Sequence, residues 1–242
     1  MTILDSRRTY EQSTDVEPGR GTMTEERPTY TPPQREMVRE VAVGGSLGEA
    51  IAGAAAAVLS ILGLAGVLPL VLLPIATIAV GAALLFEGGA ITARYAVALG
   101  SRRVGTEHGG GMTAEFFGGA CGVVLGILSL LGIAPLLLIP ASALLFGGAL
   151  MLGASAHARI NNLMISHSSE HEVTRAIARE AQSAAAAVHV LIGLSSVTLG
   201  ILALVGLAPM ILSLVAMLGL GGAALLSGSA IGGSLVSAFR QR

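Results

Sequence analysis

Six apolar runs, joined in pairs by a short Gly-x-x-Pro segment, constrain the fold of this chain more than any other feature. The runs occupy residues 48–66 and 69–90, 114–132 and 135–156, and 188–206 and 209–232. Each has about 18 to 22 residues, and a helix of that length spans about 30 Å, the thickness of a hydrocarbon core. Strands are excluded because the runs are too long and do not alternate. The sequence therefore predicts an all-α integral membrane protein with three helical hairpins and six membrane helices.

The composition favours a membrane protein over a hydrophobic soluble bundle. The chain is 53% hydrophobic and 12% charged, whereas soluble domains carry roughly 25% charged residues. Six such helices in one small chain would have no polar face to show to water. A net charge of -1, with no basic patch among aromatics, argues against nucleic acid as a partner. The basic residues are all arginine, which with abundant Ala and Gly indicates a GC-rich prokaryotic genome and hence a prokaryotic inner membrane.

The pairs of runs align as three copies of one unit. LAGVLPLVLLP (64–74) recurs as LLGIAPLLLIP (130–140) and LVGLAPMILSL (204–214). The predicted turn residues are Gly66, Pro69 and Pro74, then Gly132, Pro135 and Pro140, then Gly206 and Pro209, with Leu214 in place of the last proline. A repeat of this length predicts tandem helical hairpins.

The segments around the hairpins differ in composition. We predict a disordered cytoplasmic tail (1–33), repeat 1 with an amphipathic helix and a hairpin (34–95), a Gly-rich cytoplasmic loop (96–112), the hairpin of repeat 2 (113–160), a cytoplasmic loop with a charged helix (161–187) and the hairpin of repeat 3 (188–242). The tail is rich in Thr, Glu, Arg and Pro and poor in apolar residues, which is typical of disorder.

Every arginine lies outside the hairpins or at their open end, and no charge lies near the three turns. Arginine-bearing loops stay in the cytoplasm, so both termini and both long connections are expected there. The turns either emerge on the far side of the bilayer or stay submerged in it. Because unpaired backbone groups cost several kcal/mol each in lipid, we expect the turns to emerge.

Stripes of small residues follow three of the predicted helices. The stripes are Gly118, Gly122 and Gly126, then Ala224, Gly228 and Gly232, and, at the entry of the first hairpin, Gly44, Gly48 and Ala52. Such stripes allow helix backbones to approach closely in lipid. They predict either a surface for homo-oligomers or packing between helices of one chain, and both uses are compatible.

Ionisable residues recur at one position of the repeat. Glu49, Glu115 and His189 align there, and Glu87 on a return helix lies at a similar depth. Intramembrane acids are costly, so this layer is a candidate for a proton or cation relay or a metal site. The alternative is a Glu in the first helical turn at the interface, with SLGE (46–49) as a capping box.

HSSEH (167–171) resembles a zinc-binding pair without a specified third ligand, or another capping box. We predict no metal and no cofactor.

Two echoes in the tail, RRTYEQ (7–12) and RPTYTPP (27–33), suggest a bivalent docking motif or phosphosites, although a biased tail also produces such echoes by chance. The residues involved are Arg8, Thr9, Tyr10, Arg27, Thr29 and Tyr30.

No catalytic constellation is present, so an enzyme is not expected. The expected function is a non-enzymatic membrane scaffold or anchor that self-associates and recruits a soluble partner through the tail. The alternative is a small channel or transporter that uses the Glu/His layer.

Overall fold

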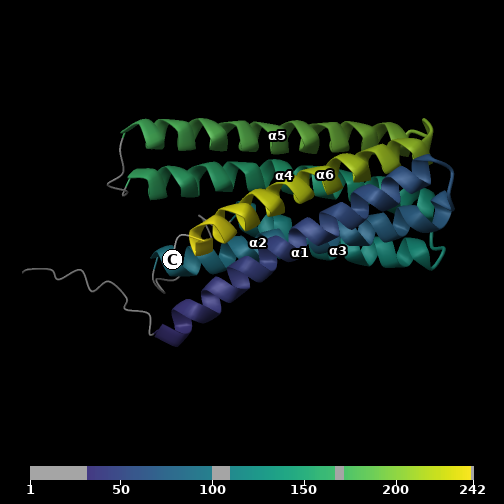
Figure 1. Ribbon diagram of the computed structural model, residues 1–242. Helices are drawn as coiled ribbons and strands as arrows, with labels where there is room; N and C mark the ends of the chain where they lie inside the picture. The colour runs from purple at the N-terminus through teal and green to yellow at the C-terminus, as the bar shows by residue number, and fades with distance from the viewer. Residues whose placement is uncertain (1–31, 100–109, 167–171, 241–242) are drawn as a thin grey trace, which may run out of the picture.

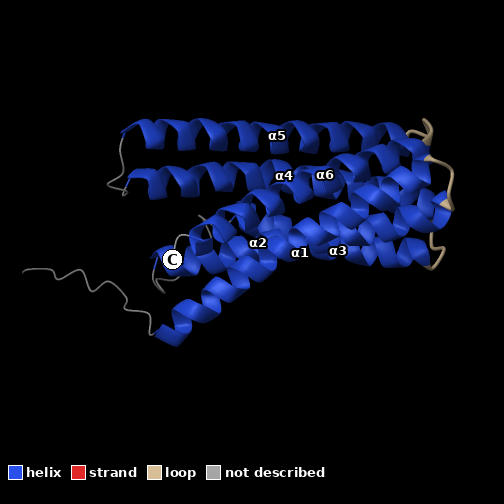
Figure 2. Cartoon of the chain, in the orientation of Figure 1, coloured by secondary structure: helices blue, strands red, loops and turns tan. Residues whose placement is uncertain are grey.

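The computed structural model describes the chain over residues 32–99, 110–166 and 172–240, with side chains over 44–89, 114–154 and 186–229. The described chain consists of helices and short turns, with no strand in these ranges (Figure 2). The helices are α1 (Pro32–Leu64), α2 (Pro69–Leu99), α3 (Gly110–Leu130), α4 (Pro135–Ser166), α5 (Glu172–Leu204) and α6 (Pro209–Arg240). The predicted disordered tail lies almost entirely outside the described residues.

Five of these helices are long and apolar enough to cross a membrane. Their candidate spans are Gly44–Leu64, Pro69–Gly89, Pro135–Ala154, Ala186–Leu204 and Pro209–Ser229. The apolar part of α3, Ala114–Leu130, is shorter. The prediction of an all-helical membrane protein is therefore confirmed, with five helices of spanning length among the described residues where six were expected.

The helices are longer than the apolar runs. α1 begins at Pro32, so the predicted amphipathic helix and the first membrane helix are one continuous helix. α4 continues to Ser166, and α5 begins at Glu172, within the segment 161–187 that was assigned to a loop and a separate charged helix. No Pro or Gly interrupts the last part of α4 or the first part of α5. Adding a residue to an existing helix requires no new nucleation, so both helices extend beyond their apolar runs.

The three short turns lie at the same end of the bundle (Figure 1). The contacts between the six described helices make a closed arrangement of three inner and three outer helices. The inner helices α2, α4 and α6 contact one another. Each outer helix packs between two inner ones: α1 between α2 and α6, α3 between α2 and α4, and α5 between α4 and α6. The spans of the inner helices are 44% to 50% buried, against 28% and 22% for α1 and α5. The first and last hairpins therefore meet through α1 and α6.

The three turns share one backbone conformation. In the first, the N–H of Gly66 donates to the carbonyl of Gly63 and the N–H of Val67 to that of Leu62, both at 3.0 Å. This pair of bonds is the Schellman motif, which needs a left-handed residue at its glycine. The φ angles there are +86° at Gly66, +83° at Gly132 and +95° at Gly206. Proline then starts the next helix, where its missing N–H costs nothing.

The core lies between the inner helices and is apolar. Val80, Phe146 and Met217 are almost fully buried on α2, α4 and α6, and Leu84, Leu150 and Leu220 extend the same cluster. On the outside, the hydroxyls of Ser195, Thr198 and Ser229 donate to carbonyls three or four residues back on their own helices. The helix thus satisfies these polar groups where they face the surroundings of the bundle.

Candidate functional site

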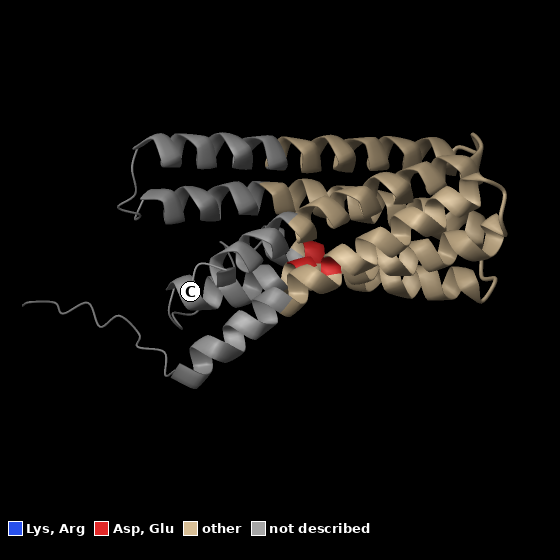
Figure 3. Cartoon of the chain, viewed as in Figure 1, with Lys and Arg blue, Asp and Glu red and all other residues tan. Residues whose placement is uncertain are grey.

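Three buried carboxylic acids meet at one end of the described bundle. Glu49 on α1, Glu87 on α2 and Glu115 on α3 are only 1%, 3% and 1% exposed. Figure 3 shows the acidic residues gathered in one place, where the described side chains begin. The structure therefore places these three acids together.

Two glycines leave space for large side chains in the layer of acids. A Cβ atom at Gly153 on α4 would collide with the carboxyl group of Glu115. A Cβ atom at Gly48 would lie 3.1 Å from the ring of Phe86, one residue before Glu87. Glycine at these two positions therefore provides the space that the Glu115 carboxyl group and the Phe86 ring occupy. The sequence pattern did not identify Gly153 as part of the layer.

His189 is set apart from the acids. It is partly buried on α5, a helix that contacts α4 and α6 but none of the helices that carry the three acids. Within the described residues, no group of three His, Cys, Asp or Glu side chains is arranged to hold a metal ion. The pair in HSSEH lies outside the described residues. Of the four predicted residues, the structure therefore brings together three.

The capping interpretation of Ser46 and Glu49 is wrong. Ser46 lies well inside α1, which begins at Pro32, and its side chain is fully buried. A residue in that position cannot cap a helix, because its own N–H and those that follow belong to the helical ladder. The acid at position 49 is therefore an interior residue of the bundle.

Glycines form the closest contacts between hairpins. A Cβ atom at Gly53, Gly119 or Gly193 on an outer helix would lie 2.7 Å from the carbonyl oxygen of Gly221, Gly81 or Gly147, respectively. These pairs join α1 to α6, α3 to α2 and α5 to α4. No larger residue fits at these crossings, because backbone lies directly opposite. The sequence signal for these crossings is that Gly53, Gly119 and Gly193 align when the hairpins are superposed in sequence, and so do Gly81, Gly147 and Gly221.

Two of the predicted small-residue stripes, those on α3 and α6, are used inside the chain. Gly118 and Gly122 pack against Ala149 and Phe146 of α4, and Gly126 packs against Ile78 of α2. Ala224 is buried, and Gly228 packs against Ser46 and Ala50 of α1. Gly232 lies on α6 beyond the described side chains. In this arrangement the described members of both stripes contact helices of the same chain.

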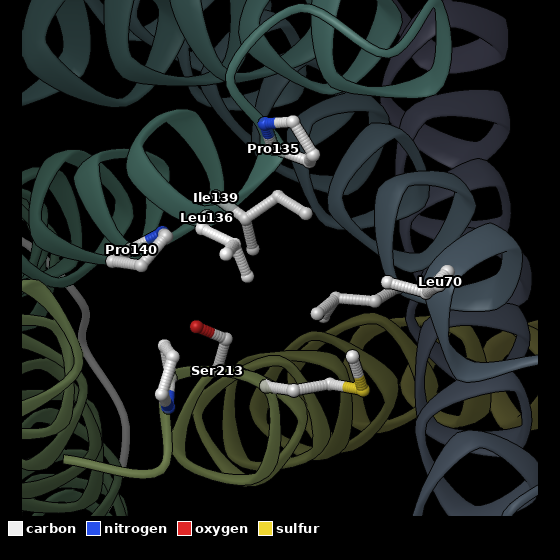
Figure 4. A pocket seen from close by; sticks show the side chains of 9 residues that line it. Leu70, Pro135, Leu136, Ile139, Pro140 and Ser213 are labelled. Carbon is white, nitrogen blue, oxygen red and sulfur yellow. The ribbon is translucent and has the colours of Figure 1, made fainter. Parts of the chain in front are cut away.

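A small hollow lies between the inner helices at the end that carries the turns (Figure 4). Leucines, prolines, Ile139 and Met210 line it, and Ser213 is its one polar residue. Ser213 is 1% exposed, its hydroxyl has no hydrogen-bond partner in the described structure, and Figure 4 shows that the hydroxyl points into the hollow. Leu73 and Ile139 occupy the aligned positions of the other repeats. The hollow exists because Ser213 is shorter than either of them.

The chain was compared with protein-family models, curated proteins and solved structures, and none of them matches it.

Proposed function

We propose that this protein is a non-enzymatic integral membrane scaffold built from three tandem hairpins. It holds a soluble partner at the cytoplasmic face of a prokaryotic inner membrane through residues 1–33. The observation that carries this proposal is the apolar core that fills the axis of the bundle. Phe146, Met217 and Val80 occupy the space between the inner helices. The buried polar residues between the acids and the turns are single Ser and Thr side chains, and the hydroxyls of Thr77 and Ser142 donate to carbonyls of their own helices. Transporters instead place polar groups or broken helices near the middle of the membrane.

The scaffold is proposed to be a homo-oligomer. Its surface offers large apolar side chains and a few small positions that remain open. A Cβ atom at Gly148 on α4 or at Gly222 on α6 would meet nothing within 4 Å. These two glycines occupy aligned positions in repeats 2 and 3. They are the small positions that we propose for contact between copies, since the described members of the predicted stripes on α3 and α6 pack internally.

Substitution at the open glycines tests this self-association. Gly148→Leu and Gly222→Leu, made together, are expected to shift the protein from oligomer to monomer in mild detergent, as measured by light scattering on a sizing column. Single Leu152→Ala, which alters an exposed apolar residue on α4, is the matched surface control. An unchanged mass in the double variant would exclude these positions from the interface.

The partner is tested by purification from membranes in mild detergent. Full-length protein, a deletion of residues 2–32 and a variant with Tyr10→Ala and Tyr30→Ala are compared by mass spectrometry of the proteins that co-purify. A partner that is present with the full tail and absent after the deletion supports the anchor. Loss in the tyrosine variant as well would assign the binding to the two Thr-Tyr echoes. Identical lists for all three would contradict recruitment by the tail.

The alternative function is a small channel or transporter with an interfacial acid layer. The observation that favours it is the burial of Glu49, Glu87 and Glu115 together, because charged groups are rarely buried in a membrane bundle without a role. This function predicts cation or proton flux into proteoliposomes that Glu49→Gln with Glu115→Gln abolishes. Flux that is absent in the native protein, or unchanged in the variant, would remove the acids from any transport mechanism.

A further inference from the structure

The end of the bundle that carries the three turns is apolar without exception. The segments 64–70, 130–136 and 204–210 contain no polar side chain. Their large side chains also project outward rather than into the bundle. The side chains of Val67, Leu68, Leu131, Ile133, Val205 and Leu207 are 47% to 71% exposed. Three separate turns therefore form one apolar surface at this end.

The backbone of the turns is largely satisfied within the chain. In the first turn, the N–H groups of Ala65, Gly66 and Val67 all donate to carbonyls of α1, at 2.9 to 3.0 Å. The same bonds recur after α3 and α5. Pro69 has no N–H to satisfy. The N–H groups of Leu68 and Leu70 and several carbonyls of the turn take part in none of these bonds. The free-energy cost of placing the turns in lipid is therefore smaller than the sequence alone suggested, because fewer backbone groups are left without a hydrogen bond.

The depth of the surface fits the far edge of the hydrocarbon. The acids and the exposed Phe116 and Phe117 lie at the opposite end of the spans. From Glu49 to Gly66 the chain advances about 17 residues, or about 25 Å, slightly less than the roughly 30 Å of a hydrocarbon core. When the acid layer lies at the cytoplasmic interface, the turns stop at or below the ester groups of the far leaflet.

We infer that the surface formed by the turns binds the acyl chains of the far leaflet, and that lipid covers the turns. The apolar side chains continue the lipid-facing surface of the spans around the end of the bundle. At that depth the backbone groups left over at the turns are at the level of the ester groups, where interfacial water donates to carbonyls and ester oxygens accept from N–H groups. The protein then offers other molecules only its cytoplasmic side. This inference depends on the membrane assignment and not on the proposed scaffold function.

Site-directed spin labelling of the full chain tests this. In a Cys121→Ser background, Leu131→Cys and Val205→Cys carry the label at two turns. Val124→Cys, exposed on α3, is the lipid control. Thr106→Cys, in the segment 96–112 that the sequence predicts to be a cytoplasmic loop, is the water control. The protein is reconstituted in vesicles of phosphatidylethanolamine and phosphatidylglycerol. Collisions of each label with oxygen and with a water-soluble nickel chelate are measured by power saturation.

Labels at the turns are expected to behave like the label at Val124→Cys. They should collide often with oxygen and less often with the nickel chelate than the label at Thr106→Cys does. Nickel collision as high as at Thr106→Cys would place the turns in water and overturn the inference. Low collision with both reagents would show that protein covers the turns, which also overturns it. Partner capture through the tail does not depend on either result, so the two proposals fail separately.

Discussion

At the scale of single residues, adjacent glycines on α4 have opposite surroundings. A Cβ atom at Gly147 would lie 2.5 Å from the carbonyl oxygen of Gly193, whereas one at Gly148 would meet nothing within 4 Å. Both substitutions to alanine gain the same helix propensity, about 1 kcal/mol. Only Gly147→Ala must push two backbones apart, which typically costs about 1 to 3 kcal/mol.

Gly147→Ala is therefore expected to lower the midpoint of thermal unfolding in mild detergent, while Gly148→Ala leaves it unchanged or raises it. Circular dichroism of the two variants and the native protein provides the measurement. Equal midpoints for the two variants would mean that α4 and α5 do not cross at Gly147.

The hydroxyl of Ser213 is a second residue with a measurable cost. It is buried without a partner in an apolar hollow, and an unsatisfied buried hydroxyl costs about 1 to 3 kcal/mol. Ser213→Val removes the hydroxyl and partly fills the hollow, so the thermal midpoint is expected to rise. Ser213→Thr adds a methyl group but keeps the hydroxyl, and it should stabilise less. A lower midpoint for Ser213→Val than for the native protein would show that the hydroxyl has a partner.

The acids illustrate how far residue patterns carry. Alignment of the repeats placed Glu49 and Glu115 at one position, and their joint burial agrees with it. Alignment also placed His189 there, yet α5 does not contact α1, α2 or α3. Position along a helix fixes depth but not which helices become neighbours. The hollow at Ser213 could not be predicted for the same reason, because a missing side chain becomes a hollow only when three helices converge on it.

At the scale of elements, the turns were the most predictable part of the fold and the helix ends the least. Gly and Pro at fixed spacing carry the conformation of the turn directly, and the positive φ of Gly66, Gly132 and Gly206 follows from it. The outer ends of the helices have no such marker. The change from apolar to charged residues near residue 160 marks the edge of the membrane, but α4 continues to Ser166.

The Schellman glycine gives a prediction for this element. A Cβ atom at Gly132 would meet nothing within 4 Å, but its φ is +83°. Gly132→Ala therefore changes the energy of the backbone alone, and left-handed φ costs an L-residue about 1 to 2 kcal/mol. The thermal midpoint should fall by about 2 to 8 °C for a chain of this size. Gly89→Ala on α2, also in open space but with an ordinary helical φ, is the control, and an equal midpoint for both would rule out the left-handed turn.

At the scale of the whole molecule, the contact between the first and last hairpins is what closes the bundle. Gly53 meets Gly221 at the same 2.7 Å Cβ-to-oxygen approach as Gly119 meets Gly81. The pattern of a single hairpin cannot predict this closure, because it does not state which helix packs against α1. A row of three hairpins in which α1 and α6 stay apart would satisfy the same hydropathy.

Closure is tested with a pair of cysteines. A Cβ atom at Gly228 would lie 2.9 Å from the Cβ of Ala50, and disulfides need about 3.5 to 4.5 Å between Cβ atoms, so a small shift suffices. Ala50→Cys with Gly228→Cys, in a Cys121→Ser background, is expected to form a disulfide within one chain after oxidation in membranes. Monomer of altered mobility on a non-reducing gel is the readout.

Two controls identify the origin of that disulfide. The first control places cysteines at Ala50 on α1 and Leu152 on α4. These two helices do not contact each other in the described structure, so no disulfide within the chain is expected. Co-expression of the two single-cysteine chains, Ala50→Cys in one and Gly228→Cys in the other, reports contact between copies. A covalent dimer there, without a shifted monomer in the double variant, would mean that α1 packs against the α6 of a second copy and that the bundle closes only in the oligomer.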